Sequence, residues 1–218
     1  MKQSASRQLY THWNEKRRGR VSPERADLDP AAIRGCIADT FMLEIDAAKT
    51  YPFRLCGTRL GALFTQDPKG SSFLAFWQPG CGREMADLLA SVHDEAMIIV
   101  AGVRAGAVSD KPADYELLLL PLRCQGKTHE RIVGCLAPVA APAWLGLVEG
   151  HPLALTSWRS ISQAALRLGG DASRSVEPRL FAAGTGPFDA QQDAVRRRAH
   201  LTVHQGGRGM LPKKTVKD

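Results

Sequence analysis

The sequence predicts an α+β domain in which helices cover one face of a five-stranded antiparallel sheet. Three features in chain order lead to this class: two short strand patterns joined by a turn, a stretch with helical spacing, and three further strand patterns. Alternating apolar residues indicate strands, whereas apolar residues three or four positions apart indicate helices. A chain of 218 residues with 44% hydrophobic residues can bury one such core and still carry extensions.

Residues 1–38 predict a helical extension before the sheet. A first helix over residues 4–18 places Leu9 and Trp13 on one side and basic residues at its end, where they favour the helix dipole. A second helix is predicted over residues 30–38, because an aspartate followed by a proline makes a good helix start.

The sheet is predicted from five strand patterns, with the helices inserted between the second and the third. Residues 40–46 alternate between apolar and polar side chains, and a short turn leads to a second strand that runs from Tyr51 to Gly57. The remaining predicted elements are a short helix carrying Leu60, Leu63 and Phe64, a packed apolar segment at residues 73–77, a helix at 83–97, and strands at 98–108, 115–124 and 131–139.

Four consecutive leucines at residues 117–120 predict a strand that is dry on both faces, because neighbouring side chains of a strand point to opposite sides. One face can pack on the inserted helices. We expect Leu118 and Leu120 on the outer face to form a dimer or partner interface together with Leu9 and Trp13 of the first helix. The alternative is that this helix folds back over its own sheet in a monomer.

Several motifs accompany this order of elements. Residues 54–60 fit an Arg-Leu-x-Gly-Thr-x-Leu signature, residues 23–30 fit Pro-x-Arg-Ala-Asp-x-Asp-Pro, and a tryptophan and an Arg-Gly pair stand near the N-terminus. In this combination the chain resembles the PAS sensory domain, and more closely a proteobacterial subfamily of small single-domain PAS proteins. The resemblance covers roughly residues 9–148 and places a PAS-like domain at residues 39–145.

PAS domains enclose a small pocket or a solid core between the sheet and its inserted helices, so the resemblance implies a domain that senses or docks. Arg54, Thr58 and Arg59 are candidates for polar groups at the mouth of a pocket. Thr58 can instead cap the helix that follows Gly57. Trp77 is predicted to plug the core, where its indole N–H needs a hydrogen-bond partner.

Two further residues are candidates for chemistry in that pocket. The thiol of Cys56 could respond to oxidants if Arg54 and Arg59 lower its pKa, and a structural role is the alternative. In haem-binding PAS proteins the helix that corresponds to the last inserted one carries the iron ligand, which makes His93 the candidate there. The alternative for His93 is a boundary position with a hydrogen bond near Asp94. We predict no cofactor, with haem as the alternative.

The chain carries no nucleophile elbow, phosphate-binding loop, zinc-protease motif or dinucleotide fingerprint, so no enzyme is predicted. The expected function is that of a stand-alone regulatory PAS protein, which senses a small ligand of unknown identity, contacts signalling proteins such as sensor histidine kinases, or does both. A haem or redox sensor and a basic-tailed nucleic-acid-binding regulator are the two alternatives.

The chain has a net charge of +7, and its excess of basic side chains lies at the two ends, because residues 26–150 carry more acidic than basic side chains. Residues 146–168 could form one more helix, and residues 169–218 predict a basic, poorly ordered tail. This tail has no aromatic residue after Phe188 that could interleave with its basic side chains, so nucleic-acid binding is not expected. The sequence contains no apolar run long enough for a membrane span and no signal peptide, which predicts a cytoplasmic protein without membrane insertion.

Overall fold

The computed structural model describes residues 1–106, 112–124 and 127–161, with backbone alone for residues 127–130. The predicted basic tail at residues 169–218, residues 107–108 of the predicted third strand and residues 125–126 between the last two predicted strands lie outside these described residues. The architecture below is that of the described part of the chain.

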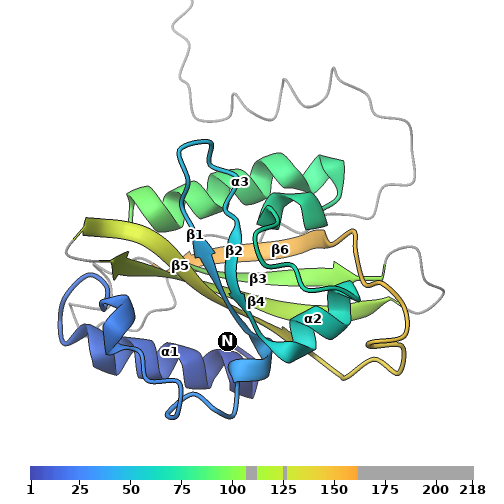
Figure 1. Cartoon of the computed structure of the whole chain (residues 1–218), viewed down its shortest axis with the longest axis horizontal. Helices are drawn as coiled ribbons and strands as arrows, with labels where there is room; N and C mark the ends of the chain where they lie inside the picture. The colour runs from blue at the N-terminus through green and yellow to red at the C-terminus, as the bar shows by residue number, and fades with distance from the viewer. Residues whose placement is uncertain (107–111, 125–126, 162–218) are drawn as a thin grey trace, which may run out of the picture. The chain divides into compact units, whose positions relative to one another are not determined.

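The described strands form one antiparallel sheet of six strands in the order β2-β1-β5-β4-β3-β6 (Figure 1). They are β1 (Thr40–Glu44), β2 (Phe53–Cys56), β3 (Ile98–Ala105), β4 (Ala113–Cys124), β5 (Lys127–Pro138) and β6 (Ala154–Ile161). The first five confirm the predicted α+β class, with the helices inserted between β2 and β3. The sixth strand is not among the predicted elements.

The helices lie on both faces of this sheet, so the prediction that they cover one face holds only for the helices inserted between β2 and β3 (Figure 1). They are the α-helices α1 (Ser4–Arg17), α2 (Thr58–Phe64) and α3 (Pro79–Asp94) and the short 3-10 helices η1 (Arg25–Asp27), η2 (Ile37–Asp39) and η3 (Phe73–Phe76). α3 begins four residues earlier than predicted because Pro79 supplies a first-turn proline.

The predicted helix over residues 30–38 is wrong. This segment forms consecutive turns, in which the N–H of Ala32 donates to the Asp29 carbonyl at 3.2 Å and the N–H of Cys36 to the Ile33 carbonyl at 2.9 Å. These bonds close three-residue steps and not the four-residue steps of an α-helix. Ile33 is buried, but Ile37 is 45% exposed, so the two isoleucines do not share one buried stripe.

The helix predicted within residues 146–168 is also wrong where the structure describes the chain, because residues 154–161 form β6 against β3. A register shift between Gly102 and Val103 of β3 interrupts this pairing. Leu155 and Trp158 consequently pack on the same core although they stand three positions apart. The helix was predicted from Leu153, Trp158, Ile161 and Leu166, whose spacing resembles that of an amphipathic helix.

The inner core fills the space between the sheet and α2, η3 and α3 with aromatic side chains. Phe53 lies at its centre, with ring centroids at 5.5–6.2 Å from those of Phe41, Phe64, Phe73 and Phe76. Such distances are those of directly packed aromatic pairs. The centre of this core is therefore packed with the protein's own aromatic rings.

The outer core lies on the opposite face of the sheet, under α1. Leu9, Trp13, Leu118 and Leu120 each have 0% of their surface exposed and pack in this cluster. α1 therefore covers its own sheet, which was the alternative to the predicted dimer or partner interface. These four residues need no second molecule to cover them, since the chain itself buries them.

Candidate functional site

The six predicted pocket residues do not line one pocket. Arg54 lies on the exposed side of β2 and forms an ion pair with Glu44 of β1. Thr58 is the first residue of α2 and is exposed, while Gly57 takes the N-cap position without any side-chain cap. The prediction that Thr58 caps this helix is therefore wrong.

Arg59 forms an ion pair with Asp39, whose side chain is only 3% exposed. One carboxylate oxygen of Asp39, Oδ1, has no hydrogen-bond partner among the described residues, and the Tyr115 hydroxyl has none either. Burial raises the pKa of Asp39, and Arg59 opposes this rise only in part. Burial, helped by the charge of Asp39, also raises the pKa of Tyr115 to about 12. Asp39 is thus a carboxylate held at an energetic cost.

Replacing Asp39 by asparagine is expected to change how stability depends on pH. Because the folded protein holds the Asp39 proton more tightly than the unfolded chain, rising pH costs the wild type stability from near the ordinary pKa of 3.8 up to the raised folded value. The stability of wild type minus that of Asp39→Asn should therefore fall as the pH rises over the range above about 4. Urea denaturation across this range measures it, and a difference that rises with pH would contradict the buried-carboxylate account.

The remaining three predicted pocket residues are Cys56, Trp77 and His93. Burial raises the pKa of Cys56 to about 12, so the expectation that neighbouring arginines lower it is wrong. Trp77 is 4% exposed within the inner core, as predicted, but its Nε1–H finds no partner among the described residues. His93 hydrogen-bonds its neighbour Asp94, which was the alternative to a haem ligand.

Two grooves lie on the outer face of the sheet. The first, called the apolar groove, has a volume of about 400 Å³ between β1, β2 and the segment of residues 25–37. Its apolar lining includes Leu28, Ile33, Ile37, Met42, Leu55 and Val133, and Arg25 is its cation. Leu55 is 50% exposed and Ile37 is 45% exposed, so two large apolar side chains meet solvent at this one place.

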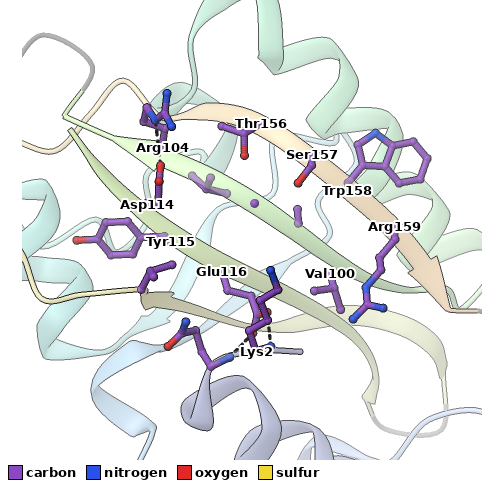
Figure 2. A pocket seen from close by; sticks show the side chains of 15 residues that line it. Lys2, Val100, Arg104, Asp114, Tyr115, Glu116, Thr156, Ser157, Trp158 and Arg159 are labelled. Atoms are coloured by element: carbon purple, nitrogen blue, oxygen red, sulfur yellow. Dashed lines mark hydrogen bonds and ion pairs between the residues drawn. The ribbon is translucent and has the colours of Figure 1, made fainter. Parts of the chain in front are cut away.

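The second groove, called the polar groove, has a volume of about 410 Å³ beside the N-terminal end of α1 and over β3, β4 and β6 (Figure 2). Strand register builds its floor, because Gly102 of β3 pairs with Glu116 of β4 on one side and with Ser157 of β6 on the other. Further along the same strands, Val100 pairs with Arg159.

Glu116 is 8% exposed, and its carboxylate accepts hydrogen bonds from the backbone N–H groups of Lys2 and Gln3, at 2.6 and 3.0 Å. This carboxylate fixes the residues that lead into α1 onto β4. At the far end of the polar groove, Arg104 Nε donates to Asp114 at 2.9 Å. Figure 2 shows that Thr156, Ser157 and Arg159 come from β6 and face the same groove.

Neither groove is apparent from the amino-acid sequence. Leu55 belongs to the pattern that predicts the second strand, with no sign of exposure, and Arg159 falls within the helix wrongly predicted for its segment. The one available signal is Glu116, an acid directly before four leucines, which has to find partners if its strand is buried.

Among the described residues no three His, Cys, Asp or Glu side chains group as a metal site would require. None of the described helices is long and apolar enough to cross a lipid bilayer.

Comparison with known proteins gives one match. A family model described as PAS domain matches residues 1–137, which includes α1, the turns that follow it, strands β1–β4 and all but the last residue of β5. No curated protein and no solved structure matches the chain. The matched region covers more than half of the 218 residues, and the strand order and inserted helices agree with it. The chain belongs to the PAS domain family.

Proposed function

We propose that this chain is a cytoplasmic regulatory protein that passes a signal to a signalling protein, such as a sensor kinase, through direct contact at the apolar groove. A sensory role is general to PAS domains, and the apolar groove supplies the surface through which it would act. All five cysteines are free thiols, which suits a reducing compartment. We expect neither catalytic turnover nor a required cofactor.

The observation that carries this proposal is the pair of exposed apolar side chains at the groove, Leu55 and Ile37. Burying a leucine or isoleucine side chain on association yields about 1.5–3 kcal/mol before other costs. Arg25 at the same groove has no ion pair among the described residues, so an acidic partner complements it. The occupant we propose is a partner segment with apolar side chains next to carboxylates.

Replacing Leu55 by arginine is expected to weaken partner binding by about tenfold or more, because it removes apolar area and adds a charge at the groove. A cross-linking amino acid placed at position 55 would first identify the partner in cells. The dissociation constant of that purified partner then compares wild type with Leu55→Arg.

Leu147→Arg is the matched control, since Leu147 is an 81% exposed leucine that does not line the groove. It should bind like the wild type. An equal loss of partner affinity in Leu55→Arg and Leu147→Arg would exclude the groove as the contact site. Cross-links to the partner that form equally well from position 147 would exclude it too. Cross-links only to a second copy of this chain would replace the signalling partner by a homodimer.

A haem or redox cofactor is the competing proposal for the sensory role. An absorbance spectrum of the purified protein between about 350 and 500 nm decides it, because haem and flavin both absorb strongly in that range. A cofactor band that disappears in His93→Ala would favour haem at α3 over the cofactor-free protein proposed above.

A further inference from the structure

We propose that the polar groove is a binding site for a small phosphate-bearing anion. This site is separate from the apolar groove and rests on none of the residues used for partner contact. Its members are Lys2 before α1 and Thr156, Ser157 and Arg159 on β6 (Figure 2). Gly102 on β3 lines it as well.

The charges of the polar groove favour an anion. Both acids of the groove are engaged, since Glu116 accepts two backbone N–H groups and Asp114 accepts from Arg104. The ammonium of Lys2 and the guanidinium of Arg159 have no ion pair within the described part of the chain. The groove therefore presents free cations and satisfied anions, which selects a ligand of negative charge.

The floor of the polar groove gathers two hydroxyl groups. A Cβ atom at Gly102 would lie 2.6 Å from Thr156 Oγ1 and 2.8 Å from Ser157 Oγ. Both hydroxyls thus converge above a residue without a side chain. Neither hydroxyl forms a hydrogen bond with another described residue, so each can donate to a ligand oxygen placed over Gly102.

The number of donors indicates the kind of anion. A guanidinium, an ammonium and two hydroxyls offer more donors than the two oxygens of a carboxylate can accept, whereas a phosphate monoester has three terminal oxygens. The volume of about 410 Å³ also exceeds what inorganic phosphate needs and leaves room for an organic substituent. A phosphate monoester fits both the donors and the space.

Calorimetric titration of the full chain with phenyl phosphate, inorganic phosphate and acetate tests this site. We expect phenyl phosphate to bind with a dissociation constant of about 1 mM or tighter, and acetate to bind at least about tenfold more weakly.

Arg159→Gln should weaken phenyl phosphate binding by about tenfold, since it removes a charge-assisted pair of hydrogen bonds. Gly102→Ala should weaken it as well, because the new methyl group displaces both hydroxyls. Stronger binding of phenyl phosphate than of inorganic phosphate identifies an organic ligand, and the reverse order identifies free phosphate.

Arg34→Gln is the control, because it removes the same charge from an exposed arginine that does not line the groove. Three results would overturn the proposal: no binding of either phosphate by the wild type, equal weakening by Arg34→Gln and Arg159→Gln, or acetate binding as tight as that of phenyl phosphate. Far-UV circular dichroism confirms that each variant is folded. Partner binding at the apolar groove should be unchanged in Arg159→Gln, so failure of this proposal is distinguishable from failure of the other.

Discussion

Replacing Trp13 by alanine is expected to lower the free energy of unfolding by about 3–5 kcal/mol, the range for removing a large buried aromatic side chain. Trp13 is fully buried between α1 and the sheet, and its Nε1–H donates to the Pro121 carbonyl at 2.8 Å. The Tyr10 ring stacks at 6.2 Å and the Arg17 guanidinium lies 5.8 Å from the indole. Urea denaturation followed by circular dichroism measures the loss.

Trp13→Phe separates packing from hydrogen bonding at this position. It keeps an aromatic ring in the outer core but leaves the Pro121 carbonyl without its donor, so we expect a smaller loss of about 1–3 kcal/mol. If Trp13→Ala unfolded with the wild-type midpoint and slope, α1 would not be bound to the sheet in solution. The outer leucines would then be free for a partner after all.

Replacing Gly57 by alanine is expected to destabilise the protein by about 2–4 kcal/mol, beyond the usual range of surface substitutions. Its backbone angles are ordinary, with φ at −69°, so conformational freedom is not the reason. A Cβ atom there would lie 2.3 Å from the carbonyl oxygens of both Ile37 and Ala38. Because these are backbone atoms, no side-chain rotation can relieve the clash, and the turn before β1 must move away from α2.

Gly61→Ala is the matched control for this prediction. Gly61 lies in the middle of α2, and a Cβ atom added to it would have the Gln66 carbonyl oxygen as its nearest neighbour at 3.7 Å, an ordinary contact. Alanine should stabilise the helix there by about 0.5–1 kcal/mol. The two substitutions, on neighbouring turns of the chain, should thus have opposite signs. Equal thermal midpoints for Gly57→Ala and the wild type would show that the turn and α2 are not in close contact.

The five strands β1–β5 could be predicted because their side chains report their surroundings locally. The alternation in residues 40–46 and the leucine run at 117–120 each specify what the two faces of a strand must contact. Short turns then require antiparallel pairing. The leucine run also required a cover on the outer face, but a sequence cannot state whether that cover is the chain's own helix or another molecule.

β6 could not be predicted because its pairing is irregular. A register shift at Gly102 moves Leu155 and Trp158 onto one face at a spacing that normally indicates a helix. The information that corrects this interpretation lies in β3, which is distant from β6 in the chain. The turns at residues 30–36 are a second error of this kind, since a good helix start there is followed by three-residue turns instead of an α-helix.

The candidate site could be predicted only in part. Trp77 lies in the core as predicted, but Arg54 and Arg59 engage acids that come from other elements, Glu44 and Asp39. Such pairings depend on how β1 and η2 meet β2 and α2 in space. The two grooves likewise combine segments distant in sequence, so local patterns carry no trace of them.

Alternate leucines of β4 belong to different cores: Leu117 and Leu119 to the aromatic one, Leu118 and Leu120 to the one beneath α1. Neighbouring residues of this one strand thus contribute to both hydrophobic cores. If that strand slides or tilts when the aromatic side repacks, the leucines on the reverse side move with it by the same amount. The surface of β4 on which α1 packs would then shift without a hinge. Glu116, which binds the residues before α1, would move together with that strand.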